Sequence, residues 1–196
     1  MRLDTSLDFD YTEDVYNPSD DSYMLLKVVE VSSGESFLEM GSGTGLTAIH
    51  AAKAGAEVTA SDISPKAVEC TKRNAAKNGL RIKTIQSDLF HNLSGIFDVI
   101  AFNPPYLPGA ANSTSWIERS WSGGGRGCET TVQFLGEAWK HLAPGGRIYL
   151  ILSSLTGLTQ VLKAAKDRYE VQLIDEKRIF FESLYAYRLK LKPSSF

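Results

Sequence analysis

The ten residues SFLEMGSGTG, numbers 36–45, decide the fold because they join a short apolar run to three alternate glycines. The apolar run suits a buried strand, and residues 46–54 suit a helix. The glycines let the backbone turn sharply and approach a ligand closely. A triphosphate-binding P-loop is disfavoured because no Gly-Lys-Ser/Thr follows, and Leu46 or Thr47 stands where the dinucleotide motif has its third glycine. Glu39, just before the glycines, favours a cationic ligand over a pyrophosphate.

A second acid follows the next predicted strand. Residues 57–61 read as that strand, and Asp62 comes directly after it, about 20 residues beyond the first glycine. At this spacing a carboxylate binds ribose hydroxyls in nucleotide-binding sheets. The alternative is that Asp62 caps the helix predicted at 65–78, but Ser64 fills that position well.

A third acid, Asp88, follows residues 81–86, which alternate polar and apolar like a half-exposed edge strand. Its carboxylate is placed to accept a hydrogen bond from an adenine amino group. Glu39, Asp62 and Asp88 thus end three successive strands. Together they predict a nucleoside site along the carboxyl edge of a parallel sheet.

The sequence Asn103-Pro104-Pro105-Tyr106 follows an apolar run at 97–101 that predicts another buried strand. The two prolines stop ladder pairing, and a residue before proline is extended, which holds the Asn103 side chain beyond the strand end. Oxygens of Asn103 and Pro104 can accept both hydrogens of a planar NH₂ group while Tyr106 packs on its plane. The alternative is a strand-end turn without function.

Length and composition limit the class of protein. With 196 residues, 43% of them hydrophobic, we expect one domain over 1–196 with a sizeable core. The net charge of −2 argues against a broad nucleic-acid surface. Cys70 and Cys128 form no CxxC and no metal-ligand spacing with the histidines, so we expect two reduced thiols and no metal site. No targeting signal or apolar run of about 18 residues occurs, and we expect a cytoplasmic protein without a membrane partner.

The N-terminal 34 residues are predicted to lie over the ligand site. Residues 1–17 mix acids with apolar side chains and read as an irregular arm on the domain. Ser19 suits the N-cap of a helix whose first turn holds Asp20 and Asp21. Asp21 or Ser22 also becomes a candidate for facing the ligand.

The second half of the chain completes an α/β pattern. Residues 107–126 contain many prolines and glycines and little periodicity, which is typical of a functional loop. We predict a seven-stranded, mostly parallel, Rossmann-like sheet with helices on both faces and a C-terminal antiparallel hairpin. The remaining helices are expected at 130–142 and 155–166, and the remaining strands at 147–152, 169–175 and 184–191.

These motifs, in this order, resemble those of class I S-adenosylmethionine-dependent methyltransferases over nearly the whole chain. Residues 103–106 resemble the motif of HemK-type N-methyltransferases of glutamine and of exocyclic amines. Residues 15–22 resemble the opening of the archaeal and eukaryotic release-factor branch, although Asn17 stands where that branch often has Glu. Trp121 with the glycines up to Gly127 and residues 182–184 also resemble that branch.

The resemblance implies S-adenosylmethionine as cofactor, with S-adenosylhomocysteine as product. Its methionine part is expected near Glu39 and the glycines, its ribose at Asp62 and its adenine at Asp88. The full implied cofactor set is Ser22, Glu39, Gly41, Gly43, Gly45, Asp62, Ile63, Asp88, Leu89 and Asn103. The implied catalytic residues, which hold the acceptor, are Asn103, Pro104 and Tyr106.

The leading hypothesis is methylation of the glutamine in the Gly-Gly-Gln loop of a release factor. An exocyclic amino group of adenine or guanine in RNA or DNA is the alternative acceptor, and an NAD-linked binding module is a third hypothesis that residues 102–106 disfavour. The resemblance also implies a small zinc-binding activator protein that docks by strand addition at the 81–86 edge. An ordinary edge on a self-sufficient monomer is the competing interpretation.

Overall fold

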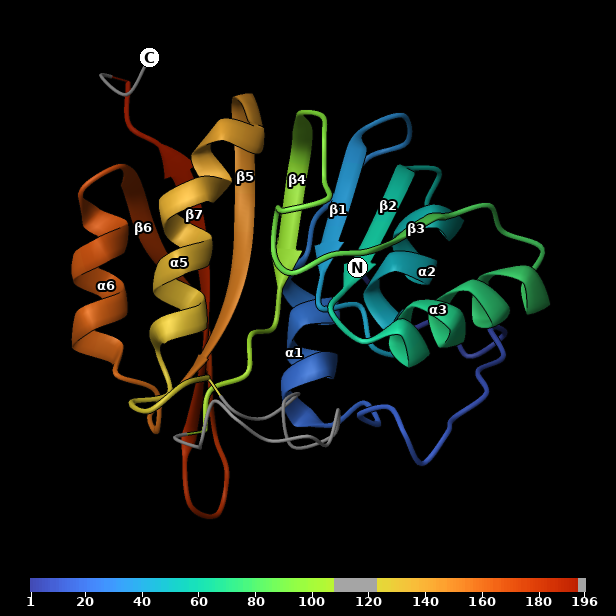
Figure 1. Cartoon of the computed structure of the whole chain (residues 1–196), viewed down its shortest axis with the longest axis horizontal. Helices are drawn as coiled ribbons and strands as arrows, with labels where there is room; N and C mark the ends of the chain where they lie inside the picture. Colours follow the sequence, from blue (N-terminus) through green and yellow to red (C-terminus); the bar gives the residue numbers. More distant parts are fainter. Residues whose placement is uncertain (108–122, 194–196) are drawn as a thin grey trace.

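The computed structural model describes residues 1–107 and 123–193, and within them the strands form one seven-stranded sheet (Figure 1). The strand order is β3-β2-β1-β4-β5-β7-β6. Pairs from β3 to β5 are parallel, whereas β7 is antiparallel to both of its neighbours, so the predicted fold is confirmed. The strands are β1 (Ser36–Met40), β2 (Glu57–Asp62), β3 (Lys83–Gln86), β4 (Phe97–Phe102), β5 (Leu142–Ser153), β6 (Tyr169–Arg178) and β7 (Ser183–Leu191).

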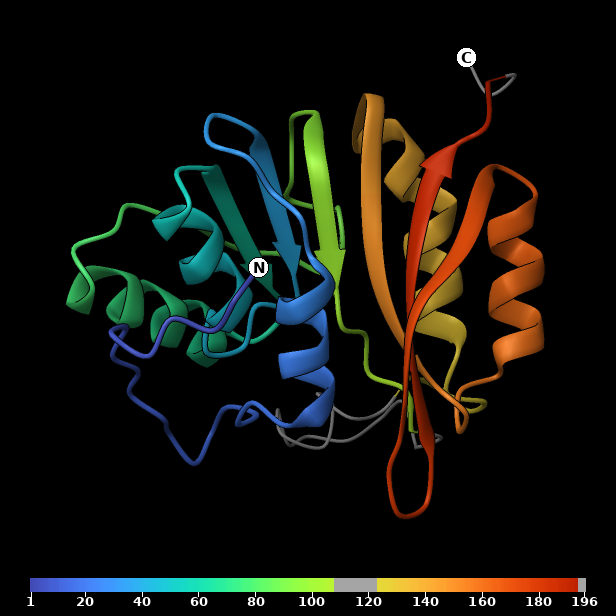
Figure 2. The ribbon, with the colours of Figure 1, turned by 180° about the vertical axis from the view of Figure 1, so that it is seen from behind.

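Helices cover both faces of the sheet (Figures 1 and 2). They are α1 (Asp20–Val28), α2 (Leu46–Lys53), α3 (Pro65–Lys77), α5 (Glu129–Ala138) and α6 (Leu158–Lys166), with a 3₁₀ turn, η1 (Trp139–His141), after α5. One core cluster joins the sheet to α1 and α2, and another joins it to α5 and α6. None of the helices in the described ranges has both the length and the apolar character needed to cross a membrane.

Alternation along β1 sorts its side chains between the two cores. Leu38 and Met40 lie in the core under α5 and α6, and Phe37 lies in the core under α1 and α2. Because successive strand residues point to opposite faces, Glu39 shares the face of Phe37. That face carries α2, whose first turn follows the glycine loop directly. The strand register therefore aims a buried acid at the start of this helix.

The second half of the chain differs from the sequence-based prediction at several boundaries, one of them the end of β6, which is Arg178 and not residue 175. β5 starts at Leu142, not at residue 147, because Pro144, Gly145 and Gly146 form an irregularity within the strand and not a turn before it. Gly145 has φ +78°, which a side chain would strain. The predicted helix 130–142 consequently ends at Ala138, and the last helix begins at Leu158. Residues 108–122, which include Trp121 and most of the predicted loop, lie outside the described residues.

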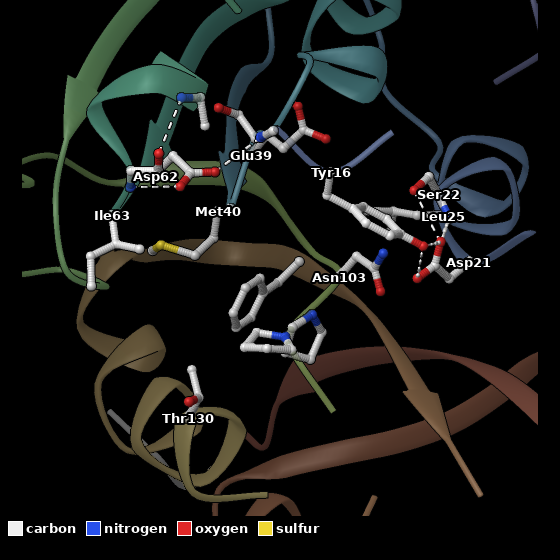
Figure 3. A pocket seen from close by; sticks show the side chains of 18 of the residues that line it. Tyr16, Asp21, Ser22, Leu25, Glu39, Met40, Asp62, Ile63, Asn103 and Thr130 are labelled. Atoms are coloured by element: carbon white, nitrogen blue, oxygen red, sulfur yellow. Dashed lines mark hydrogen bonds between the residues drawn. The ribbon is translucent and has the colours of Figure 1, made fainter. Parts of the chain in front are cut away.

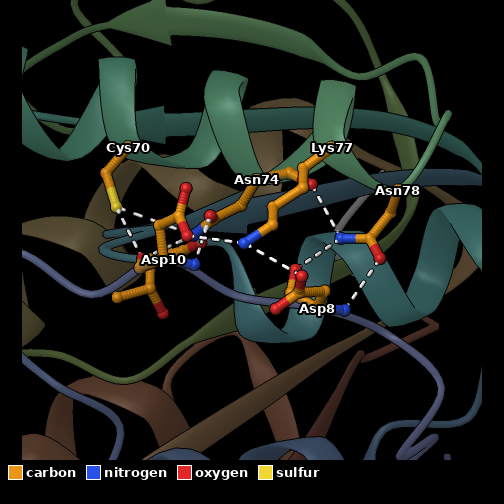
Figure 4. A network of polar contacts seen from close by, with 7 residues as sticks. Asp8, Asp10, Cys70, Asn74, Lys77 and Asn78 are labelled. Atoms are coloured by element: carbon orange, nitrogen blue, oxygen red, sulfur yellow. Dashed lines mark hydrogen bonds and ion pairs between the residues drawn. The ribbon is translucent and has the colours of Figure 1, made fainter.

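The N-terminal arm, predicted at residues 1–17, extends to Ser19, the residue before α1, and is held along α3 by a polar network (Figure 4). Asn74, fully buried on α3, donates through Nδ2 to the carbonyls of Asp10 (3.1 Å) and Thr44 (2.9 Å) and accepts from the N–H of Asp10 (2.8 Å). Lys77 adds ion pairs to Asp8 (2.9 Å) and Asp10 (2.6 Å) at the surface. Asn74 thus fastens the arm and the glycine loop to the same helix.

Candidate active site

A cavity of about 700 Å³ opens at the carboxyl ends of β1, β2 and β4, between α1 and α5. It brings together nearly all of the predicted site residues (Figure 3). Those that line it are Ser22, Glu39, Gly41, Gly43, Asp62, Ile63, Asp88, Leu89, Asn103, Pro104 and Tyr106. Gly45 is the exception: it is the N-cap of α2 with φ +83°, and a Cβ there would lie 2.9 Å from Thr71 Cγ2. The turn into α2 therefore requires glycine at position 45.

Glu39 is a buried acid at one wall of the cavity. Its Oε2 accepts from the N–H of Ala48 (2.8 Å) in the first turn of α2. Burial raises the pKa of Glu39 to about 8, against the opposing effect of hydrogen bonds from Ala48 and Thr47. The nearby Asp62 carboxylate raises this pKa further. A cationic group bound here would reverse the shift, because it favours the ionised form of Glu39.

Asp62 is held by the two loops that flank it. Its Oδ2 accepts from the N–H of Gly43 (3.0 Å) and its Oδ1 from the N–H of Ser64 (2.9 Å). Burial raises the pKa of Asp62 despite these bonds. Ser64, not Asp62, caps α3, since its Oγ accepts from the N–H of Ala67 (3.4 Å). The capping alternative for Asp62 is therefore wrong, and Asp62 lines the cavity with lone pairs left for further donors.

Two backbone conformations shape the cavity wall. Gly41 has φ +65°, and a Cβ there would lie 3.3 Å from the Phe102 ring, so glycine keeps this turn close to β4. Leu89 has φ +45°, a strained value for a residue with a bulky side chain. Its carbonyl accepts from Ser87 Oγ (2.7 Å), which stabilises that conformation. Asp88, directly before Leu89 in the chain, is exposed and lines the cavity.

Asn103 lies on the side of the cavity where Tyr16 and Asp21 lie, away from Asp62 and Ile63 (Figure 3). Its Oδ1 is buried and has no hydrogen-bond partner, a property it shares with one other side-chain atom among the described residues. A buried amide oxygen without a partner is costly, and such groups are rare unless a ligand completes them. The position thus offers a free acceptor for an N–H group.

Asp21 joins two tyrosines from distant parts of the chain beside Asn103. The Tyr16 hydroxyl donates to its carboxylate at 3.2 and 3.3 Å, and the Tyr106 hydroxyl donates at 3.4 Å. Asp21 also accepts from the N–H (2.6 Å) and Oγ (3.0 Å) of Ser22. Burial, and then the Asp21 charge, raise the pKa of both tyrosines, which keeps them protonated as donors. Both rings are therefore fixed at the cavity wall.

Sequence reasoning missed Tyr16 as a lining residue and only raised Asp21 as a candidate. The available signal was the acid pair Asp20–Asp21, since one acid is enough to complement the start of a helix. It also missed the wall formed by α5, from which Glu129, Thr130 and Gln133 line the cavity. No motif marked these positions, because only tertiary packing brings α5 to this edge.

A family model for the methyltransferase small domain matches residues 17–180. The chain belongs to this family. A putative protein N5-glutamine methyltransferase of Methanocaldococcus jannaschii is 38% identical over 183 residues, covering 90% of this chain and 93% of the relative. The resemblance to HemK-type class I methyltransferases is thereby confirmed, and S-adenosylmethionine is the methyl donor of this methyltransferase.

Two further comparisons extend the relationship. A release factor glutamine methyltransferase of Deinococcus radiodurans is 39% identical over 123 residues, which cover 59% of this chain and 44% of the relative. The E. cuniculi Mtq2–Trm112 complex, described as responsible for methylation of the eRF1 translation termination factor, has a TM-score of 0.72 at 21% identity. That match covers 91% of this methyltransferase and 99% of the solved chain, and it shows the shared fold.

Proposed function

We propose that this methyltransferase transfers a methyl group to the side-chain amide nitrogen of a glutamine in the Gly-Gly-Gln loop of a peptide chain release factor. The observation that carries the proposal is the buried Asn103 Oδ1, which has no partner at the end of β4. The names of the M. jannaschii and D. radiodurans relatives, both glutamine methyltransferases, support the same acceptor.

The donor set of the cavity fits S-adenosylmethionine. Its cationic methionine end suits the buried Glu39, and its ribose hydroxyls suit Asp62. Ile63 and Leu89 offer apolar walls to the adenine, with Asp88 as an acceptor at the rim. Because Gly41 and Gly43 have no side chains, the ligand can approach the main chain of this turn closely. Ser22 lines the end of the cavity that holds the acceptor. When bound, this cofactor supplies an electrophilic methyl group on a sulfonium centre.

The chain's own part in transfer is to hold the acceptor amide in line with that methyl group. Asn103 Oδ1 and the Pro104 carbonyl accept the two N–H hydrogens, and the Tyr106 ring packs against the amide plane. Both acceptor bonds strengthen as the nitrogen gains positive charge. Fixing two reactants in near-attack geometry can lower a barrier by about 7–11 kcal/mol, so positioning is the main catalytic term.

We assign residues 1–34 to a cover over the cofactor within a single domain of residues 1–196. Val15, Tyr16, Pro18 and Leu25, from the arm and α1, line the cavity and support this assignment. The cytoplasm, where translation takes place, is the proposed location.

A small zinc-binding activator is proposed to dock on β3. This strand lies at one edge of the sheet and pairs only with β2 among the described strands, so its outer backbone groups can accept another strand. The two-protein E. cuniculi complex supports the idea of a partner. Size-exclusion chromatography with such a protein tests it: the wild type should form a complex that Lys83→Pro abolishes. Full activity alone, without a complex at micromolar concentration, contradicts it.

Tritium transfer from labelled S-adenosylmethionine tests the acceptor. The assay compares a release factor, the same factor with its Gly-Gly-Gln glutamine changed to alanine, and total RNA. Label is expected in the unmodified release factor alone. Equal labelling of the alanine variant would show another acceptor residue, and labelling of RNA alone would establish the nucleobase alternative.

A further inference from the structure

The tip of the β6–β7 hairpin exposes two adjacent phenylalanines. Phe180 is 100% exposed and Phe181 94% exposed, the two highest values among the large apolar side chains that the structure describes. Their rings lie 6.5 Å apart and are tilted by 42°, so they pair with each other. Ile179, the residue before them, packs against the core under α1 and α2. The pair is thus presented to solvent from an anchored base.

The turn chemistry gives no reason for phenylalanine at these positions. The N–H of Ile179 donates to the carbonyl of Glu182 (2.9 Å), which leaves Phe180 and Phe181 as a two-residue hairpin loop. Such loops favour Asn, Asp and Gly, because their tight turns need positive φ. Neither phenylalanine has positive φ, so the turn is not of that type and does not restrict the residues at these two positions. Two large apolar side chains that the turn does not require, and that stay exposed, are typical of an interaction site.

The hairpin is fastened beside the acceptor end of the cavity. It projects past the carboxyl end of β4 in both views of the chain (Figures 1 and 2). Glu182, directly after the pair, accepts from Ser153 Oγ, and its charge helps to raise the pKa of Tyr106. On the other strand, Lys177 forms an ion pair with Asp20 (2.9 Å), the first residue of α1.

Two further apolar side chains are exposed at this end of the sheet. Leu107, just after the acceptor motif, is 37% exposed, and Leu155, just after β5, is 44% exposed. We refer to the four exposed side chains at this end, Leu107, Leu155, Phe180 and Phe181, as the apolar rim. Beside the rim, Lys177 is paired with Asp20 (2.9 Å) and Glu182 is an acid, while Arg178 is exposed. The charges around the rim are therefore mixed and the rim itself is apolar, which suits an apolar protein surface better than a phosphate backbone.

We infer that Phe180 and Phe181 form a docking anchor for the methyl-acceptor protein and bind an apolar patch beside the loop that carries the acceptor amide. This inference rests on the proposed function. An amide held by Asn103 enters a cavity that Leu107 of the rim also lines, and the body of a folded acceptor then lies next to the hairpin that projects past β4. Aromatic anchors at the centre of an interface carry much of its binding energy.

The test compares a folded release factor with a short peptide that spans its Gly-Gly-Gln loop, because the peptide reaches the cavity without covering the hairpin. The double variant Phe180→Ser, Phe181→Ser should raise KM for the folded factor by about tenfold or more. Its kcat/KM for the peptide and its affinity for S-adenosylhomocysteine should not change. Ile96→Ser is the matched control, because it removes an apolar side chain that is 54% exposed and lies just before β4. It should change the KM for neither the folded factor nor the peptide.

Each other outcome decides the question. A wild-type enzyme that does not label the release factor overturns the proposed function and this inference together. If the wild type and the double variant label the release factor equally well, the inference alone is overturned. An equal loss of kcat/KM for the folded factor and the peptide would mean that Phe180 and Phe181 support the structure of the cavity and do not dock the acceptor. A concentration-dependent dimer, or flotation with anionic vesicles, that the variant abolishes without a KM effect assigns the pair to self-association or to a lipid surface.

Discussion

The two ends of the cavity differ in how their polar groups are satisfied. At the end formed by β1, β2 and the glycine loop, Glu39 and Asp62 already accept hydrogen bonds from backbone N–H groups of neighbouring segments. At the other end, Asn103 Oδ1 has no partner, and Asp21 holds Tyr16 and Tyr106 from segments far apart in the sequence. The first end is organised before any ligand binds, whereas the second keeps an acceptor free for the substrate.

Among the variants proposed for the two ends of the cavity, a change of Asn103 should have the largest effect on methyl transfer. Asn103→Ala removes the free acceptor, and methyl transfer should fall by about 10²- to 10³-fold, the cost of losing one preorganised hydrogen bond at a reacting centre. Affinity for S-adenosylhomocysteine, measured by calorimetry, should stay near that of the wild type.

Thr131 provides the matched control for Asn103. Among the residues that the structure describes, its Oγ1 is the other buried side-chain N or O atom without a partner, and Thr131 is not among the residues that line the cavity. Thr131→Val keeps the shape of the side chain and should leave transfer unchanged. If Asn103→Ala weakened cofactor binding as much as transfer, its role would be structural.

Glu39 should make the stability of the free protein depend on pH. Below about pH 4.5 the carboxyl is protonated in both the folded and unfolded states. Between about pH 4.5 and 8 it stays protonated only when folded, because its folded pKa is raised to about 8. The free energy of unfolding should therefore fall as pH rises through this window, by up to about 1.4 kcal/mol per pH unit.

The Glu39→Gln variant isolates this contribution from that of Asp62, whose pKa is also raised. Denaturant unfolding of both proteins at several pH values measures the difference. The variant should gain stability relative to the wild type as pH rises from 5 to 8, and it should bind S-adenosylhomocysteine more weakly at pH 8. A difference that does not vary with pH would mean that Glu39 is ionised in the folded protein.

The contrast between the two ends also explains what the sequence could predict. Glu39 and Asp62 follow predicted strands at recognisable spacings from Gly41, so a short stretch of chain contains their whole environment. Tyr16 lies only five positions before Asp21, within the stretch 15–22. Tyr106, in contrast, is 85 positions from Asp21 and meets it only through tertiary packing. No local pattern can contain such a contact.

Strand boundaries show the same limit. β1 and β2 were predicted closely because acids and glycines bound their apolar runs. The start of β5 was wrong because Pro144 to Gly146 have turn chemistry, yet pairing with β4 resumes on both sides of them, at Leu142 and Arg147. Pairing with a neighbouring strand thus overrode a local signal that is normally dependable.

Asp62→Ala tests the end of the cavity that is expected to bind the cofactor. Loss of the carboxylate leaves ribose hydroxyls and the N–H groups of Gly43 and Ser64 without partners, and affinity for S-adenosylhomocysteine should fall by about 1.5–3 kcal/mol. Calorimetry measures this change. Asp62→Asn keeps one carbonyl oxygen and should lose less. Unchanged affinity in both variants would remove Asp62 from the cofactor site.

Asn74 joins the two ends and should give the smallest of these effects on function. It binds Asp10 of the arm that carries Tyr16, and Thr44 of the glycine loop, from a fully buried position. Asn74→Ala leaves those backbone groups without partners, so the free energy of unfolding should drop by about 1–3 kcal/mol. Cofactor affinity should fall only severalfold, because neither Glu39 nor Asp62 loses a hydrogen bond.

Lys77→Ala, which removes only the solvent-exposed ion pairs of the same arm, should destabilise less than Asn74→Ala, and its effect should vanish at high salt. Denaturant unfolding at low and high ionic strength compares the two variants. If Lys77→Ala proved the more damaging at both ionic strengths, surface charge and not the buried amide would hold the arm against α3.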